Sequence, residues 1–99
     1  IISIKVNDIA CIKAKGSYAE IYFKDKSKLL TSKYLRYFEE SLAEEEGFVR
    51  VHRSSIVNMS FIAAYDKGMQ MIILENDMEV AVSRDKKSLF EDVKSKKLI

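Results

Sequence analysis

Basic and hydroxyl side chains gather in three short segments of the chain, each of which follows an apolar run. The segments are Lys13–Tyr18, Arg50–Ser55 and Ser83–Lys87. Arginine carries a planar fork of N–H donors that fits two phosphate oxygens or the O6/N7 edge of guanine. Lysine supplies a point charge and serine a short hydrogen bond to phosphate, while Gly16 allows backbone amides to approach a phosphate closely. This chemistry is typical of contact with nucleic acid.

A purely structural interpretation of the same residues remains open. Surface lysines are usually solvated charges rather than ligand contacts. Arg53 and Arg84 could pair with glutamates elsewhere in the chain, and Tyr18 could pack beside a hairpin. His52 is the single histidine, and a lone histidine in a strand is more often a hydrogen-bonded structural residue than a ligand. Spacing alone therefore does not decide between the two interpretations.

Catalytic and metal chemistry find little support in the composition. One histidine and one cysteine cannot build a zinc site without unusual help from carboxylates. No G-x-S-x-G motif occurs, and the three glycines, at 16, 47 and 68, are too isolated to form a phosphate-binding loop. We expect neither an enzyme nor a bound metal or cofactor. Cys11 lies in the apolar run IACI, which predicts a buried, inert thiol in a reducing, cytoplasmic setting.

The chain of 99 residues is predicted to form one domain, residues 1–99. It has a formal net charge of only +2, but five of its fifteen acidic residues lie between residues 39 and 46. The rest of the chain carries 17 basic residues against 10 acidic ones, so a positive face is expected despite the small total. No apolar run is long enough to span a membrane. The abrupt, strand-like start indicates a domain cut from a longer protein.

Short β-rich runs separated by turn residues dominate the chain, which predicts a mostly β fold with antiparallel pairing. The strands are expected within residues 2–6, 9–15, 18–24, 28–32, 48–53, 61–66, 69–75 and 78–83. Four strands would thus precede any helix, and FVRVHRSSIVN would be one strand ending in a polar turn. Hairpin loops are expected at residues 25–27, 66–68 and 76–77, with Gly68 in a left-handed conformation.

Two helices are predicted. From Lys33 the apolar period changes, with Leu35, Phe38 and Leu42 on one face, Ser32 as N-cap and Gly47 as the stop. Its glutamates would face water, away from DNA. A last amphipathic segment, residues 85–97, places Leu89, Phe90 and Val93 on one side with Ser83 as N-cap.

Four stretches of the chain together resemble the LytTR family of bacterial DNA-binding domains. They are DIACIKAKGSYAEIYF, LLTSKYLRYFEESL, FVRVHRSSIVNMSFI and EVAVSRDKKSLFEDV, which run nearly from end to end. The most specific piece is aromatic-x-R-V-H-R-S-x-I-V-N. The resemblance implies an elongated, mostly antiparallel β fold with one mid-chain helix and a C-terminal helix, in which loops rather than a recognition helix enter the major groove.

The resemblance also implies a set of DNA contacts. Arg53 and Arg84 would read base edges, with Ser54, Lys86 and Lys87 beside them at phosphates. His52 and Asn58 match the motif and are assigned to shaping the turn. Ala19 could offer only an apolar contact, such as one to a thymine methyl group. The full set of expected contact residues is Lys15, Ser17, Tyr18, Ala19, Arg53, Ser54, Arg84, Lys86 and Lys87.

The implied function is sequence-specific binding of double-stranded DNA as the output module of a bacterial response regulator in a two-component system. Family sites are commonly direct repeats occupied by two copies, which implies a domain that is monomeric in isolation, with an upstream receiver or sensor domain. One alternative is a protein-interaction module of a signalling protein, using strand edges and the Glu-rich helix. Another is a single-stranded nucleic-acid binder that stacks bases on Tyr18, Tyr22 and Tyr34.

Overall fold

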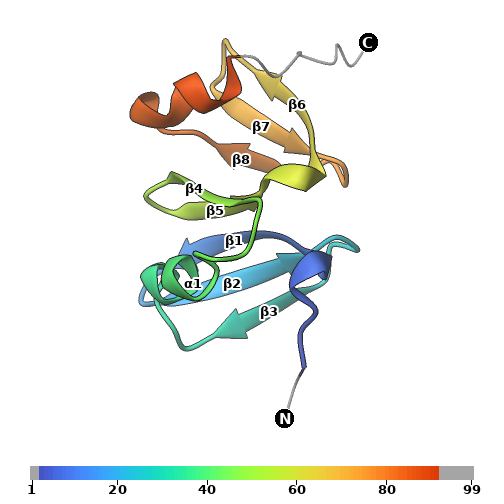
Figure 1. Ribbon diagram of the computed structural model, residues 1–99, viewed down its shortest axis with the longest axis vertical. Coiled ribbons are helices and arrows are strands. Elements are labelled where there is room, and N and C mark those ends of the chain that lie inside the picture. Colours follow the sequence, from blue (N-terminus) through green and yellow to red (C-terminus); the bar gives the residue numbers. More distant parts are fainter. Residues whose placement is uncertain (1–2, 92–99) are drawn as a thin grey trace.

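The computed structural model of the chain describes residues 3–91, which form eight β-strands, one α-helix and three 3-10 helices (Figure 1). Chain order determines the labels used below. The strands are β1 (Ile9–Lys15), β2 (Tyr18–Phe23), β3 (Lys28–Thr31), β4 (Phe48–His52), β5 (Ser55–Asn58), β6 (Ile62–Asp66), β7 (Met71–Leu74) and β8 (Glu79–Ala81). The helices are η1 (Val6–Asp8), α1 (Leu35–Ser41), η2 (Met59–Phe61) and η3 (Arg84–Phe90).

Two antiparallel sheets are stacked along the long axis of a molecule that measures 42 × 26 × 25 Å (Figure 1). The larger sheet has the order β3-β2-β1-β5-β4, and the smaller one has the order β6-β7-β8. Every strand pair is antiparallel. The predicted fold class, an elongated and mostly antiparallel β domain, is therefore confirmed.

The central strand β1 is buried on both faces, which explains why it reads as the continuous apolar run IACI. Cys11 points into the core between the two sheets, together with residues such as Val57 and Phe90. Its neighbour Ile12 points the opposite way, into the core that α1 covers. Burial raises the pKa of the Cys11 thiol to about 11, so the predicted buried thiol is confirmed.

Helix α1 covers the outer face of the larger sheet, as its apolar period predicts. Leu35 and Leu42 are buried, and Phe38 packs against the same core. The predicted N-cap is wrong, because Tyr34 occupies that position and no side chain caps the helix. The helix ends at Ser41 and turns follow it; Gly47, with φ of +96°, is the last turn residue before β4.

Two of the predicted strands are wrong. The described residues of the opening segment form no strand, because the chain turns into η1 with the Asp8 amide donating to the Lys5 carbonyl. Among the described residues, three strands rather than four therefore precede α1. The stretch FVRVHRSSIVN is not one strand but the β4–β5 hairpin, which reverses direction at Arg53 and Ser54.

The predicted hairpin loops after β2 and β7 are confirmed, but the one after β6 differs in detail. Gly68 does not adopt positive φ; the left-handed residue is Gln70, with φ of +50°. The turn has four residues, Lys67–Gln70, rather than a short glycine loop, and the Asp66 carboxylate accepts from the Met69 amide within it.

The C-terminal helical segment is described only up to residue 91, and that part is the 3-10 helix η3. Phe90 is fully buried and stacks on Tyr65, with ring centroids 5.2 Å apart. Leu89 does not share this burial, because the tighter 3-10 period turns it to solvent. Ser83 occupies the N-cap position without capping η3. Val93 and residues 92–97 of the predicted helix lie outside the described residues.

Candidate nucleic-acid interface

Strand direction brings the first two basic segments to the same edge of the larger sheet. Strand β1 runs toward this edge and ends at Lys15, and β5 starts there with Ser55 paired to Lys13. The β4–β5 turn therefore lies beside the β1–β2 turn. A backbone hydrogen bond of 2.8 Å, from the Ala14 amide to the Ser54 carbonyl, joins them. In Figure 1 both turns lie on the left side of the molecule.

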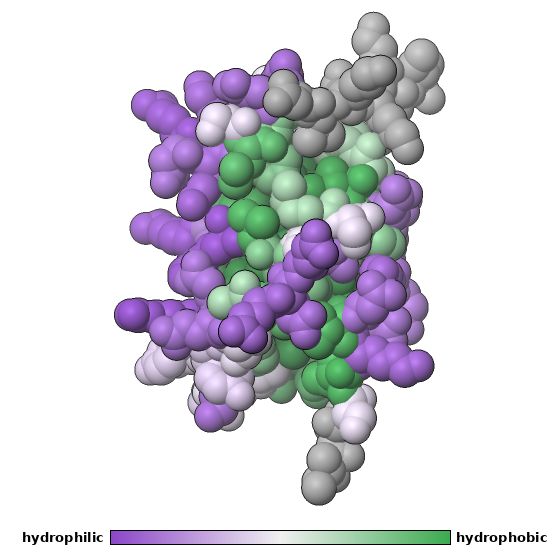
Figure 2. Space-filling model, viewed as in Figure 1, coloured by the Kyte–Doolittle hydropathy of each residue, from purple (hydrophilic) through white to green (hydrophobic). Residues whose placement is uncertain are grey.

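The third segment reaches the same edge through the outer strand β4. Because β4 is the outermost strand on this side of the sheet formed by residues 3–91, its carbonyls are available to other segments. The Val51 carbonyl accepts from the Ser83 amide at 2.8 Å and from the Ser83 hydroxyl at 3.2 Å. Helix η3 begins at the next residue, Arg84. Three segments far apart in sequence thus share one edge. Figure 2 shows mostly hydrophilic side chains projecting along the left side of the molecule.

Most of the predicted contact residues present their side chains to solvent at this edge. The exposed ones are Lys15, Ser17, Tyr18, Arg53, Arg84 and Lys87, and the half-buried ones are Ser54 and Lys86. Ala19 is an exception and contradicts the prediction. Its side chain is 0% exposed because the residue after Tyr18 in β2 faces the core beneath α1. It therefore cannot offer its methyl group to a base.

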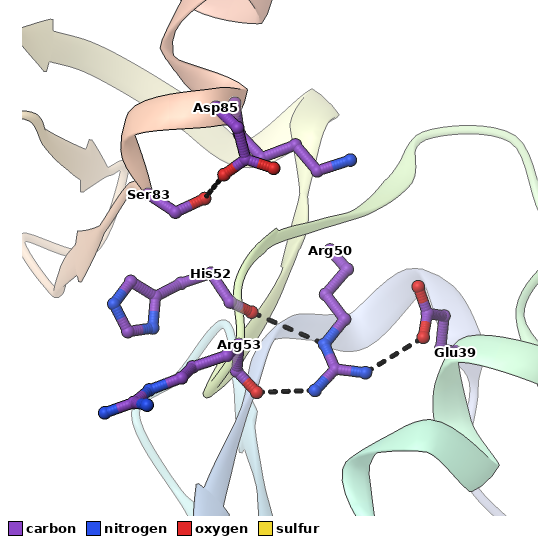
Figure 3. A pocket seen from close by; sticks show the side chains of 7 residues that line it. Glu39, Arg50, His52, Arg53, Ser83 and Asp85 are labelled. Atoms are coloured by element: carbon purple, nitrogen blue, oxygen red, sulfur yellow. Dashed lines mark hydrogen bonds and ion pairs between the residues drawn. The ribbon is translucent and has the colours of Figure 1, made fainter.

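A hollow of about 330 Å³ lies between the β4–β5 hairpin, α1 and the start of η3 (Figure 3). Cations and anions both line it: Glu39, Arg50, His52, Arg53, Ser83, Asp85 and Lys86. The glutamate comes from the helix that was expected to lie away from DNA. The helix therefore brings the Glu39 carboxylate to the basic edge, while its other glutamate, Glu40, pairs with Arg36.

Arg50 lies in the hollow with its guanidinium toward the β4–β5 turn and Glu39, whereas Arg53 points away from them (Figure 3). Nη1 of Arg50 lies 3.0 Å from the Glu39 carboxylate, and its Nε and Nη2 donate to the carbonyls of the β4–β5 turn. The glutamate pairing considered for Arg53 and Arg84 is therefore made by Arg50 instead. Within residues 3–91, neither Arg53 nor Arg84 forms an ion pair.

His52 holds the same turn through its ring. Nδ1 accepts from the Ser54 amide at 3.1 Å and lies 2.7 Å from the Ser54 hydroxyl. An amide can only donate, so Nδ1 is the acceptor of the hydrogen bond from the Ser54 amide. These contacts are those of a residue that shapes the turn, the role assigned to it from sequence.

Asn58, the last residue of the motif, is buried and ties the larger sheet to the next turn. Its Nδ2 donates to the Ile9 carbonyl at 2.9 Å, and its Oδ1 accepts from the amide and hydroxyl of Ser60. All its side-chain groups are thus engaged within the protein. Asn58 supports the β5–η2 connection and has no surface left for a ligand.

Asp85 is the acidic residue within the third basic segment. A hydrogen bond from the Ser83 hydroxyl at 2.7 Å, together with its own backbone amide and nearby Lys86, holds the pKa of this carboxyl below its usual range. It is therefore ionised near neutral pH. The exposed charge of the edge nevertheless remains positive, because Lys15, Arg53, Arg84 and Lys87 all project from it.

Sequence reasoning included Arg50 and Asp85 in the basic segments without assigning them a role, and it did not place Glu39 at this edge. A signal for Arg50 exists, because Arg50 and His52 stand two residues apart on a strand and therefore share a face. No comparable signal links Glu39 to Arg50, since their approach depends on how α1 packs. Among residues 3–91 there is no group of three metal-ligating side chains, and no helix there is long and apolar enough to span a membrane.

Comparisons with known proteins agree with one another. The family model described as the LytTr DNA-binding domain matches residues 1–95. A solved LytTr DNA-binding domain from a Bacillus cereus protein, described as a methyl-accepting/DNA response regulator, superposes with a TM-score of 0.73 at 27% sequence identity. The alignment covers 90% of this chain and 83% of that one. No curated protein sequence matches the chain significantly.

Proposed function

Because this chain belongs to the LytTr DNA-binding domain family, we propose that it recognises specific double-stranded DNA sequences as the output module of a bacterial transcriptional response regulator. One observation carries the proposal. The three basic segments are brought to one edge and joined there by the Ala14–Ser54 and Ser83–Val51 hydrogen bonds. A scattered, merely solubilising set of charges would not need this convergence.

The exposed side chains divide into two roles. Arg53 and Arg84 project from different segments and read base edges in the major groove. Phosphates are held by the short hydroxyl side chains of the serines and by the compact charges of the lysines, and Tyr18 lies beside the first turn. These phosphate contacts are Lys15, Ser17, Ser54, Lys86 and Lys87. Base contacts supply sequence preference, while phosphate contacts supply affinity and register.

The proposed assembly places two copies of the domain on direct repeats of a promoter. The isolated domain is then a monomer, and an upstream receiver or sensor domain in the full regulator controls its use. DNA in a bacterial regulator is reached in the cytoplasm, which is therefore the proposed location. Membership of the LytTr DNA-binding domain family supports these proposals.

Fluorescence anisotropy tests the function directly. The domain is titrated against a duplex obtained by selection from a random pool and against a scrambled duplex, at two salt concentrations. We expect tighter binding to the selected duplex, weakening steeply with salt because phosphate contacts release counterions. Equal and feeble binding to both duplexes would overturn the proposal.

Arginine variants test the assignment of the base readers. Arg53→Ala or Arg84→Ala should cost about 1 to 3 kcal/mol on the selected duplex and relax sequence preference. Lys5→Gln is the control, because Lys5 is exposed and precedes η1, which leads into the start of β1, whereas the three segments gather at the other end of β1. It should leave preference unchanged. An Arg53→Ala variant with native affinity and preference would remove that residue from the interface.

A protein-interaction module is the second candidate, and one observation favours it. Edge strand β3 leaves Leu30 57% exposed, and Tyr34 beyond it is 67% exposed. Exposed apolar side chains on an unpaired strand edge are a common site of strand addition by a partner. Leu30→Ser should abolish such an association while leaving duplex binding intact, so the two candidates make opposite predictions for this variant.

A further inference from the structure

We propose that Arg50 is a positioning residue, which braces the β4–β5 turn so that Arg53 is presented to DNA, and that Glu39 of α1 holds Arg50 in place. The inference rests on the proposed function, since it assigns Arg53 as a base reader. It gives a role to Arg50, the first arginine of the FVRVHRSSIVN motif. That residue otherwise looks like a further phosphate contact.

The three bonds of the Arg50 guanidinium converge on one turn and one helix (Figure 3). Nε donates to the His52 carbonyl at 3.4 Å and Nη2 to the Arg53 carbonyl at 2.5 Å. Nη1 lies 3.0 Å from Oε1 of Glu39. The planar fork thus binds two successive carbonyls of the turn, which a lysine ammonium with its single nitrogen cannot reproduce.

The turn needs such a clamp because the β4–β5 ladder is irregular beside it. The pairing register shifts between Arg50 and His52. Arg50 pairs with Ile56 and His52 with Ser55, so β4 advances two residues while β5 advances one. A bulge of this kind re-aims the following side chain and is common beside functional sites. The brace, together with the His52 ring bound to Ser54, fixes the direction in which the next residue leaves the sheet.

Arg50 is not itself well placed for DNA. Its side chain is only 28% exposed, and each of its three nitrogens already has an acceptor in the protein. Reaching a phosphate would break the bonds to both carbonyls and separate the guanidinium from Glu39. Arg53 is exposed and has no ion-pair partner among the described residues, so it is the group free to leave the surface.

The decisive variant is Arg50→Lys, which keeps the charge and removes the fork. We expect binding to the selected duplex to weaken about tenfold, roughly the loss of one charge-assisted hydrogen bond, while binding to the scrambled duplex stays the same. The salt dependence should also be unchanged, because no phosphate contact is lost. If Arg50 instead contacts phosphate, lysine will preserve the preference, and this result would overturn the brace.

Glu39→Gln tests the other end of the brace, with Glu40→Gln as its control. Both variants remove one charge from α1, but Glu40 is paired with Arg36 on the exposed face, at 3.6 Å. Any general gain in DNA affinity that comes from removing an acidic charge should therefore appear in both variants. The ratio of selected to scrambled binding should fall several-fold for Glu39→Gln relative to Glu40→Gln. Equal ratios for the two variants would remove Glu39 from the proposal.

The outcomes separate this inference from the proposed function. A native domain that does not discriminate between duplexes refutes DNA readout itself. A native domain that discriminates, together with an Arg50→Lys variant that discriminates equally well, refutes only the brace. Urea unfolding of each variant identifies any loss of stability, and Glu39→Gln, a surface substitution, provides the test if Arg50→Lys does not fold.

Discussion

Two turns stand side by side at the basic edge, and they are held in opposite ways. The β4–β5 turn is held by side chains: the Arg50 guanidinium binds its carbonyls, and the His52 ring binds Ser54. The β1–β2 turn, residues 16–17, has no side-chain hydrogen bond among the described residues and depends on the positive φ of Gly16, +59°. The same sheet thus supports one braced turn and one that only backbone conformation defines.

The contrast teaches how a β-sheet edge can serve as a reading surface. A reader of base edges must arrive in one orientation, and bracing removes the conformational freedom that would otherwise be lost on binding. A phosphate contact tolerates more variation, because charge attraction depends weakly on angle. The braced turn carries the proposed reader Arg53, and the unbraced one carries the proposed phosphate contacts Lys15 and Ser17.

The largest effect on stability is expected from Gly16→Ala. A side chain at φ of +59° strains the backbone by about 1 to 2 kcal/mol, although a Cβ there would meet nothing within 4 Å. Gly68→Ala is the matched control, because Gly68 lacks positive φ and its Cβ would meet only the Asp66 carboxylate at 3.4 Å. Urea denaturation should show a clear loss for the first variant and little change for the second. Equal losses would mean that backbone conformation does not define the β1–β2 turn.

Residue patterns were sufficient to predict the architecture. The apolar run IACI predicts a central strand, and the spacing of Leu35, Phe38 and Leu42 predicts the helix that covers it. Both elements are recognisable because the burial of their side chains produces a regular pattern of apolar residues in the sequence. The residues that form the basic edge were also identified, because charge and hydroxyl content are local properties as well.

Other features could not be predicted because they depend on register and packing. The Arg53–Ser54 turn contains none of the glycine or asparagine that usually marks a hairpin, so FVRVHRSSIVN reads as one strand. The burial of Ala19 follows from the register of β2 against β1, and a shift of one residue would have exposed it. The Arg50–Glu39 contact depends on a bulge and on a helix position, neither of which has a local signature.

A smaller effect should distinguish the two turns at their serines. Ser54→Ala removes the hydroxyl beside Nδ1 of His52, a contact of 2.7 Å, and should cost about 0.5 to 1.5 kcal/mol of unfolding free energy. Ser17→Ala makes the same change in the unbraced turn, where the hydroxyl has no hydrogen bond within the described part of the chain. It should stay within about 0.5 kcal/mol of the native domain. If urea unfolding showed equal losses of unfolding free energy for the two variants, the contrast between the turns would be contradicted.

The smallest effect is expected at the start of η3, where the Asp85 carboxylate accepts a hydrogen bond from Ser83. The hydrogen bond from Ser83 lowers the pKa of Asp85, so the native state favours its ionised form. Its contribution to stability is complete above the pKa of the unfolded chain, and it disappears as the pH falls through the lower, folded value. Unfolding free energies measured from about pH 5 downward should therefore decline less steeply in Asp85→Asn than in the native domain. Ser83→Ala removes the donor and should flatten the same part of the profile, and the combined variant should be no flatter than Asp85→Asn alone. A combined variant with a still shallower profile would show that the acid dependence at the start of η3 does not come from this bond.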